Sequence, residues 1–211
     1  MKLRTSPTYN NFHRFDVSTP DFWDKKYSEN EHSWDIGRPT PIFQNWASNI
    51  KNKSSCKICI PGCGYGHDVI YLSKLGFDVY GFDFSSKAIN TIKKNNKSLN
   101  VKCEDFFSID NSYDTFFDYI LEYTFYCAIN PQNRLAYVDK CYNLLKDKGK
   151  LIAIMLPVAN DYDSNGPPFN VTKKELTENF NEKFNLISLQ KNKLSIKQRR
   201  EIEYYAEYEK K

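Results

Sequence analysis

Residues 56–83 read CKICIPGCGYGHDVIYLSKLGFDVYGFD, and the order of patterns along this stretch decides the fold. The apolar run 56–61 is short enough for one buried strand, and a glycine-rich turn follows it directly. Apolar residues at helical spacing predict a helix over 67–75, which the next glycine ends. A second strand over 77–82 leads into Asp83. Strand, glycine turn, helix, strand and acid form the first half of a nucleotide-binding α/β sheet.

The spacing of the glycines selects the type of ligand. Gly62, Gly64 and Gly66 form G-x-G-x-G, whereas a dinucleotide site requires G-x-G-x-x-G and would place its third glycine at His67. The following helix directs free N–H groups and its positive end at the turn. Asp83 lies about 20 residues after the first glycine, where such folds place an acid for ribose hydroxyls. The turn resembles motif I of class I S-adenosylmethionine (SAM) methyltransferases, and a glycine turn without a cofactor is the alternative.

Length and composition suit one intracellular domain. The 211 residues fit a single α/β domain, and 40% hydrophobic residues are enough for a core. A net charge of +4, scattered apart from the C-terminal segment, indicates no nucleic-acid surface. We see no apolar span long enough for a membrane and no signal peptide. Among six cysteines, Cys56 and Cys59 would lie on opposite faces of a strand, so we expect buried free thiols in a reducing cytoplasm.

The rest of the chain alternates helical and strand patterns. Residues 1–20 are polar and are expected to form a loosely held arm. Helices are expected over 21–27, 42–50, 85–95 with Ser85 as N-cap, 131–145 and 172–180, and strands over 101–103, 116–126, 150–157, 183–191 and 198–208. This alternation predicts a doubly wound, Rossmann-like α/β fold.

Six segments carry a more specific resemblance. They are WDIGRPTP at 34–41, PGCGYGHDV at 61–69, GFDFS at 81–85, EDFF at 104–107, FYCAI at 125–129 and GPPF at 166–169. In this order they resemble the thiopurine S-methyltransferase family, most closely its halide/thiol methyltransferase branch. The resemblance implies one methyltransferase domain over 1–211, with 1–50 as an N-terminal arm and helices covering the active site. It also implies a seven-stranded sheet, mostly parallel with an antiparallel edge strand, and helices on both faces.

The resemblance implies SAM as the cofactor and S-adenosylhomocysteine as its product. It assigns the ribose hydroxyls to Asp83 and the adenine to Asp105 and Phe106. The alternatives are a turn cap for Asp83, a surface acid for Asp105 and ordinary packing for Trp23 and Trp34. If the tryptophans do close over the sulfonium, its contact with an aromatic face is worth about 0.5–2 kcal/mol. The expected cofactor residues are Trp23, Trp34, Gly62, Gly64, Gly66, Asp68, Asp83, Phe84, Ser85, Asp105, Phe106 and Glu122.

The expected acceptor is a thiol, sulfide or halide that is methylated by in-line displacement. Such an acceptor is already an anion and needs no proton shuttle; accordingly, we identify no catalytic residue and no metal-ligand cluster among the residues. Arg199 is expected near the acceptor, where it would attract the anion, with a solvated charge at a strand edge as the alternative. The expected pocket residues are Tyr123, Phe125, Tyr126, Pro167, Pro168, Phe169 and Arg199.

Other functions stay open at this stage. One is a SAM methyltransferase for a metalloid oxyanion or for an oxygen or nitrogen nucleophile; another is a non-catalytic SAM-binding partner subunit. Residues 122–125 read EYTF, which is not the Asn/Asp-Pro-Pro-Tyr clamp typical of several N-methyltransferases. Glu122 stands where relatives often have Asp, and Tyr65 where plant relatives have glycine, so the identity of the acceptor is less constrained than the cofactor. We expect a small-molecule substrate and a monomer.

Overall fold

The stretch that decides the fold forms the unit that its pattern predicts. The computed structural model describes residues 16–159 and 166–211. Strand β1 (Lys57–Pro61) leads through the glycine turn into helix α3 (His67–Lys74), and strand β2 (Asp78–Asp83) pairs parallel with β1. Gly76, with a φ of +92°, separates the helix from the second strand. The predicted boundaries of these elements are confirmed to within one residue.

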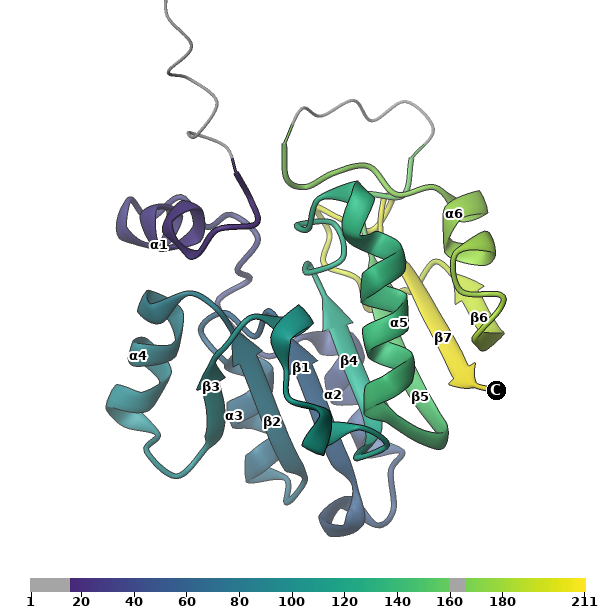
Figure 1. Cartoon of the computed structure of the whole chain (residues 1–211), viewed down its shortest axis with the longest axis horizontal. Helices are drawn as coiled ribbons and strands as arrows, with labels where there is room; N and C mark the ends of the chain where they lie inside the picture. The colour runs from purple at the N-terminus through teal and green to yellow at the C-terminus, as the bar shows by residue number, and fades with distance from the viewer. Residues whose placement is uncertain (1–15, 160–165) are drawn as a thin grey trace, which may run out of the picture.

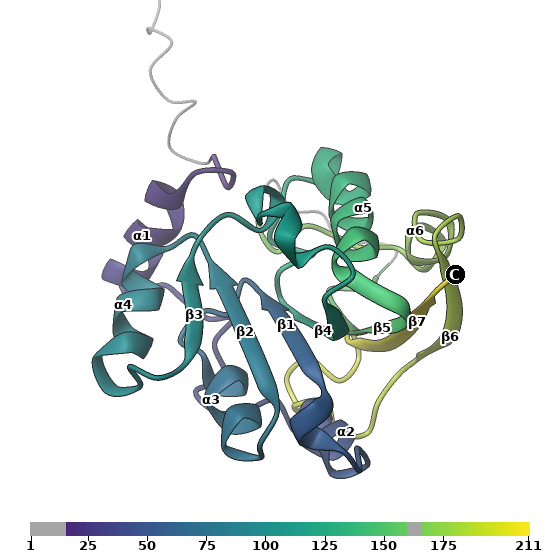
Figure 2. The same cartoon turned by 60° about the horizontal axis from the view of Figure 1, so that its bottom comes forward.

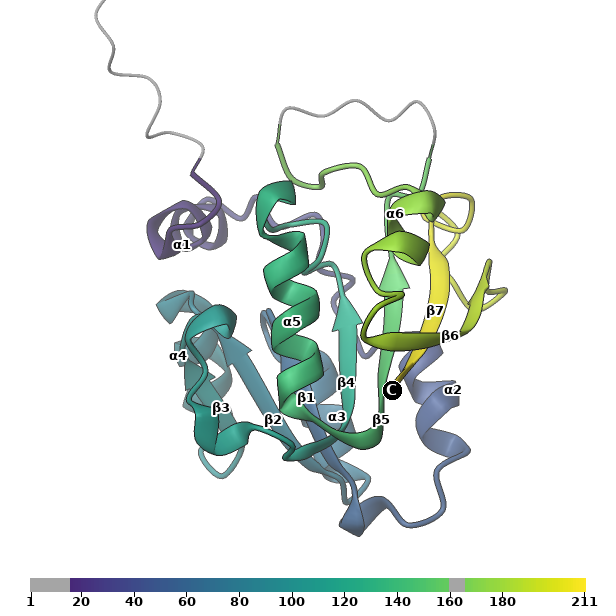
Figure 3. The same cartoon turned by 45° about the vertical axis from the view of Figure 1, so that its right-hand side comes forward.

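The seven strands form a single sheet in the order β3-β2-β1-β4-β5-β7-β6 (Figure 1). The remaining strands are β3 (Asn100–Cys103), β4 (Phe117–Tyr123), β5 (Leu145–Met155), β6 (Phe184–Gln190) and β7 (Tyr204–Lys210). Strands β1 to β5 are parallel, and β7 runs antiparallel to both β5 and β6. The antiparallel strand therefore lies one place in from the edge, as Figure 3 shows. The chain leaves β1 toward β2 and β3, and later returns to β4 on the other side. Ligands of doubly wound sheets bind at such a switch point.

Side chains alternate along the strands and build one core on each face of the sheet. Ile58 and Ile60 pack on one face and Cys59 on the other, which is the alternation expected of a strand buried on both sides. Helices α2 (Pro41–Ser48), α3 and α4 (Ser86–Asn95) contribute to the first core. Helices α5 (Arg134–Leu144) and α6 (Lys173–Glu178) contribute to the second core (Figures 1 and 2). The predicted doubly wound fold with helices on both faces is confirmed.

Helix α1 (Pro20–Ser28) lies beyond the carboxyl ends of the parallel strands, beside α4 (Figure 1). Asp24 of α1 accepts hydrogen bonds from the hydroxyls of Ser85 and Ser86 and from the N–H of Lys87, at the start of α4. Helix α2 packs instead on the face of the sheet, with Phe43 and Ala47 fully buried. We use "arm" below for residues 16–40, and what was expected of residues 1–15 lies outside the described residues.

Several predicted boundaries are wrong. Strand β4 ends at Tyr123 rather than at residue 126, because Thr124 has a φ of +66° and turns the chain. Strand β5 begins at Leu145 rather than at residue 150, with an irregularity in which Lys148 has a φ of +60°. The last strand begins at Tyr204, after a turn over 197–202. Short 3₁₀ turns occupy Lys53–Ser55, Phe106–Ser108, Asn111–Tyr113 and Pro131–Asn133, the last of which precedes α5.

The six cysteines are free thiols, as expected. Cys59, Cys127 and Cys141 are buried, whereas Cys103 is exposed, so the expectation of burial is wrong for that residue. In the two described ranges, no helix combines the length and the apolar character that crossing a membrane requires.

Candidate active site

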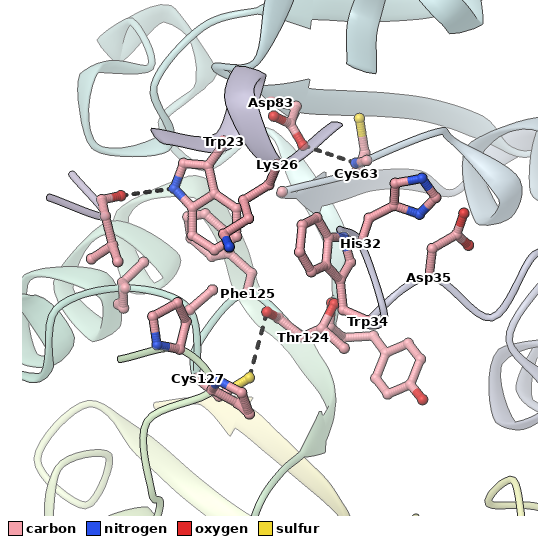
Figure 4. A pocket seen from close by; sticks show the side chains of 18 of the residues that line it. Trp23, Lys26, His32, Trp34, Asp35, Cys63, Asp83, Thr124, Phe125 and Cys127 are labelled. Atoms are coloured by element: carbon pink, nitrogen blue, oxygen red, sulfur yellow. Dashed lines mark hydrogen bonds between the residues drawn. The ribbon is translucent and has the colours of Figure 1, made fainter. Parts of the chain in front are cut away.

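A cavity of about 1320 Å³ lies at the carboxyl ends of β1, β2 and β4. The arm, the glycine turn, the end of β2, the turn after β4 and the segment 166–168 line it. Figure 4 shows Trp23, Trp34, Phe125 and Cys127 around the same space, with Asp83 at its far side. The cavity therefore lies at the switch point of the sheet, where the sequence places the glycine turn.

The glycine turn forms one wall because it can approach its neighbours closely. Gly62 has a φ of +55°, and a Cβ added there would lie 2.4 Å from Cδ2 of Phe125. A Cβ on Gly64 would lie 3.1 Å from the hydroxyl of Tyr27 on α1. Both residues line the cavity. Gly66 does not; its missing side chain makes room for Ile92 of α4, whose Cδ1 would lie 2.7 Å from a Cβ.

Asp83 is held at the end of β2 by backbone groups. One carboxylate oxygen accepts the N–H of Gly64 and the other the N–H of Ser85, each at 2.9 Å. Burial raises the pKa of Asp83 to about 6, although these two hydrogen bonds act to lower it. Each carboxylate oxygen has a second lone pair. A pair of vicinal hydroxyls, such as those of a ribose, can therefore still donate to this carboxylate.

Asp105 caps a short turn and also lines the cavity. Its carboxylate accepts the N–H of Phe107 at 3.2 Å and the hydroxyl of Ser108 at 3.3 Å. Phe106, which follows it, is 2% exposed and packs edge-on against Phe125 with ring centroids 5.5 Å apart. Asp105 is therefore a turn cap at the cavity rather than a surface acid, and its adenine role stays a prediction.

The arm contributes an aromatic wall opposite the glycine turn. Trp34 meets Trp23 edge-on at a centroid distance of 5.4 Å and Tyr27 at 5.6 Å. Tyr27 in turn contacts Tyr65 of the glycine turn at 5.0 Å. The indole N–H of Trp23 donates to the carbonyl of Val17 at 2.8 Å, which orients that ring. Both tryptophans line the cavity as expected.

Two polar contacts join the arm to the start of α3. The backbone N–H and the hydroxyl of Thr40 each donate to Asp68 at 2.7 Å, and burial raises the pKa of Asp68. Nε2 of His67 lies 3.1 Å from Asp35. This contact raises the pKa of His67, whereas burial acts to lower it. In Asp35, burial acts to raise the pKa, but the hydrogen bonds hold it below its usual value.

The opposite end of the cavity is mostly apolar. Phe125, Cys127, Pro167 and Pro168 line it, as does Tyr123 near the arm. Two predicted pocket residues lie behind this wall rather than in it. Tyr126 is 1% exposed and donates its hydroxyl to Glu175 at 2.9 Å. Phe169 likewise does not line the cavity, and its N–H donates to the carbonyl of Cys127 at 2.7 Å, which holds the proline segment in place.

Three predicted cofactor residues also lie outside the cavity lining. They are Gly66, Ser85 and Glu122. Ser85 caps α4 by accepting the N–H of Ala88, as its sequence position predicts. Glu122 is 1% exposed and accepts the N–H groups of Phe125 and Tyr126 at 3.0 and 2.9 Å. The side chains of Ser85 and Glu122 therefore shape the turns around the cavity. The remaining predicted residues, Phe84 and Arg199 among them, do line it.

Sequence reasoning missed Tyr27, His32 and the contact between Asp35 and His67. Tyr27 follows Trp23 by four residues in a helix, and residues at that spacing share a face. That spacing was the signal that could have placed Tyr27 beside the cavity. No local signal pairs Asp35 with His67, which is 32 residues away.

The described residues fit SAM. A turn in which Gly62 and Gly64 lack a Cβ, a buried carboxylate with free lone pairs and an aromatic wall suit an amino-acid and ribose portion and a cationic sulfonium. Gly62, Gly64, Asp83, Trp23 and Trp34 would contact it.

Comparisons with known proteins agree with this fit. A profile of the thiopurine S-methyltransferase family matches residues 18–208. The probable thiol methyltransferase 2 of Arabidopsis thaliana is 31% identical over 195 residues, which cover 89% of this chain and 84% of that protein. Thiocyanate methyltransferase 1 of the same plant is 33% identical over 154 residues, which cover 71% of this chain and 66% of that protein.

A solved structure shows the same fold. It is the 1,6-didemethyltoxoflavin-N1-methyltransferase of Burkholderia thailandensis with bound 1,6-didemethyltoxoflavin and S-adenosylhomocysteine. Its TM-score is 0.71 at 14% identity, with 98% of this chain and 93% of that chain covered. The match over nearly the whole chain and the identity to the plant relatives show that this protein belongs to the thiopurine S-methyltransferase family of SAM-dependent methyltransferases.

Proposed function

We propose that this family member methylates a small acceptor that binds as an anion: a thiolate, hydrosulfide or halide ion. The observation that carries the proposal is the chemical character of the acceptor end of the cavity. Aromatic rings, prolines and aliphatic side chains form this end, including Phe125, Pro167 and Pro168. A soft anion such as a thiolate or iodide is less strongly hydrated than an oxyanion, so its desolvation in such a site costs less.

The polar groups on this wall are not in a state to remove a proton from the acceptor. The hydroxyl of Thr124 donates to the carbonyl of Tyr123 at 2.6 Å. The thiol of Cys127 donates to the carbonyl of Thr124 at 3.5 Å, and burial raises its pKa to about 12, so it stays neutral at physiological pH. The hydroxyl of Tyr123 donates to Glu203 at 2.7 Å. An acceptor that is already ionised needs none of them as a base.

The charges favour the same reaction. Bound SAM supplies an electrophilic methyl group on a cationic sulfur. The rings of Trp23 and Trp34 present aromatic faces and edges on the cofactor side of the cavity, and Phe125 packs against Gly62 between the two ends. These side chains exclude water and orient the two reactants. Charges of opposite sign cancel during transfer, so a dry site costs the transition state less than the separated ions.

The names of the plant relatives support a sulfur acceptor. One is a probable thiol methyltransferase and another a thiocyanate methyltransferase. We propose the same chemical class here, in which the product is a methylated sulfur compound or a methyl halide.

The test is a product assay that compares four acceptors, which differ in size and in the atom that is methylated. Purified protein is incubated with SAM and, separately, with sulfide, methanethiol, iodide and a bulky aromatic thiol. Methanethiol, dimethyl sulfide or methyl iodide in the headspace, with equimolar S-adenosylhomocysteine in solution, is the expected result. Product from the aromatic thiol alone would place the acceptor on the thiopurine side of the family. Binding of SAM without product from any of the four would refute the proposed acceptor class.

We also propose that residues 1–211 form one methyltransferase domain that acts as a monomer in the cytoplasm. A single sheet that uses strands from residue 57 to residue 210 supports one domain. Six free cysteines, three of them buried, support a reducing compartment.

A further inference from the structure

Arg199 donates two hydrogen bonds to the arm and one to Tyr123, at the edge of the acceptor wall next to the arm. Its Nη2 donates to the carbonyls of Ser33 and Trp34, both at 2.9 Å. Its Nη1 donates to the hydroxyl of Tyr123 at 2.7 Å. Three of the five N–H donors of the guanidinium are thereby used by protein groups. One side chain near the C-terminus thus bridges the arm and the end of β4.

A buried carboxylate completes this network. Glu203 is 1% exposed and accepts the hydroxyl of Tyr123 at 2.7 Å. Its backbone N–H donates to the carbonyl of Arg199 at 2.8 Å, so the two residues occupy one turn. The positive charge of the guanidinium is therefore partly offset within the protein, which weakens it as a receptor for a free anion.

The carbonyls that Arg199 holds belong to the residues that carry the aromatic wall. Trp34 places its ring against Trp23 and Tyr27, on the cofactor side of the cavity. Asp35, the next residue, contacts His67. Releasing the two carbonyls would free the arm between these contacts and let the Trp34 ring leave the cavity.

We propose that Arg199 is a positioning residue that fastens Ser33 and Trp34 over the cofactor side of the site, and acts on methyl transfer through Trp34. The inference rests on the proposed function in one respect only, namely that methyl transfer takes place in this cavity. It replaces the expectation that the guanidinium attracts the acceptor anion.

Charge and geometry can be separated at this position by two substitutions. Arg199→Lys keeps the positive charge but lacks the planar fork that reaches two carbonyls and a hydroxyl together. Arg199→Gln removes the charge as well. A fastening role predicts that both variants lose function to a similar degree, whereas an anion receptor predicts that lysine preserves most of it. Arg200→Gln, at the exposed neighbouring residue, is the matched control.

The first readout is binding of S-adenosylhomocysteine in the absence of any acceptor, measured by titration calorimetry. We expect about tenfold weaker binding for both Arg199 variants, the loss of about one charge-assisted hydrogen bond, and no change for Arg200→Gln. The second readout is hydrogen exchange. The N–H groups of Asp35 and Gly37, which are bonded within the arm, should exchange faster in the Arg199 variants while those of β4 do not change.

Tyr123→Phe removes one hydroxyl and serves as a milder test that preserves the fold. It should weaken binding of S-adenosylhomocysteine, as Arg199→Gln does. The double variant should lose less binding free energy than the sum of the losses in the two single variants. Unchanged S-adenosylhomocysteine binding and unchanged exchange in the arm, with only a higher KM for the acceptor, would overturn the inference and restore the anion role. Both readouts are independent of turnover, so they decide the question even if the proposed acceptor class is wrong.

Discussion

Replacing Gly62 by alanine tests how closely the turn after β4 packs on the glycine turn. Gly62 has a φ of +55°, in the left-handed region that disfavours residues with a Cβ. The new methyl group would lie 2.4 Å from Cδ2 of Phe125 and 3.0 Å from its Cγ. Phe106 at 5.5 Å and Tyr137 at 6.0 Å block the ring on one side, so it can withdraw only toward the cavity that it lines.

The expected cost has two parts. A left-handed backbone costs an alanine about 1–2 kcal/mol relative to glycine. Forcing a methyl group into a packed site costs about 1–3 kcal/mol more. The free energy of unfolding should therefore fall by about 2–5 kcal/mol, out of the roughly 5–15 kcal/mol typical of a domain. Movement of Phe125 would also change the shape of the cavity, so binding of S-adenosylhomocysteine should weaken.

Urea unfolding of two comparison variants separates the backbone cost from the cost of the clash with Phe125. Gly76→Ala has a φ of +92° and no atom within 4 Å of its new methyl group, so it should cost about 1–2 kcal/mol only. Phe125→Ala removes the ring atoms that clash, so adding Gly62→Ala to that variant should cost little beyond the backbone term. The reasoning is refuted if Gly62→Ala destabilises no more than Gly76→Ala, or if its full cost persists without the Phe125 ring.

Further predictions concern the arm and the turn after β4. Trp34→Ala should weaken binding of SAM, measured without an acceptor, about two- to thirtyfold and should lower turnover, because an aromatic contact to the cationic sulfonium is lost; unchanged calorimetric affinity and initial rates would count against the aromatic wall. The contact between His67 and Asp35 should stabilise the fold most between about pH 4 and 6.5. Because the pKa of Asp35 is lowered in the folded protein, this carboxylate adds stability at pH values above the usual pKa of aspartate. Because the pKa of His67 is raised, its ring adds stability that is lost as the pH rises through that raised pKa. The difference in unfolding free energy between wild type and His67→Gln should accordingly be larger at pH 6 than at pH 9, and an equal difference at both would contradict this. Glu122→Ala should cost about 2–6 kcal/mol in urea unfolding because the N–H groups of Phe125 and Tyr126 and the buried hydroxyl of Tyr137 lose their acceptor. Glu122→Gln should cost much less; similar costs would show that these donors find another partner.

The parts of the fold with strong local signals were predictable. The unit over residues 56–83 combines an apolar strand, a glycine turn, helical periodicity and a terminal acid, and each signal acts within a few residues of the element it defines. The N-cap Ser85 is equally local, because its side chain accepts an N–H three residues later. Predicted boundaries were wrong where a buried side chain takes backbone N–H groups in a way that the hydrophobic pattern does not reveal. Strand β4 ends early because Glu122 takes the N–H groups of Phe125 and Tyr126, which a strand would have paired with a neighbour.

The candidate site was predictable in its cofactor half and less so in its acceptor half. Gly62, Gly64 and Asp83 lie at the ends of predicted strands, so their convergence follows from the parallel order of the sheet. Tyr126 and Phe169 share a predicted wall with Phe125 and Pro168 but point elsewhere, because nothing in a turn sequence reveals which side chain faces the cavity.

The contacts that hold the arm had no sequence signal, although two of them end at helix starts that were predicted; the third comes from Arg199, in a turn where a strand was predicted. Asp24 meets the start of α4, Asp35 meets His67 at the start of α3, and Arg199 reaches Ser33 and Trp34 from a position 165 residues or more away in sequence. None of these contacts involves the apolar wall at residues 124–129 and 166–168. Because only Tyr123 belongs to both sets, substitutions at residues 124–129 and 166–168 should change acceptor preference without loosening the arm, and substitutions at Asp24, Asp35 or Arg199 should weaken cofactor binding for every acceptor alike.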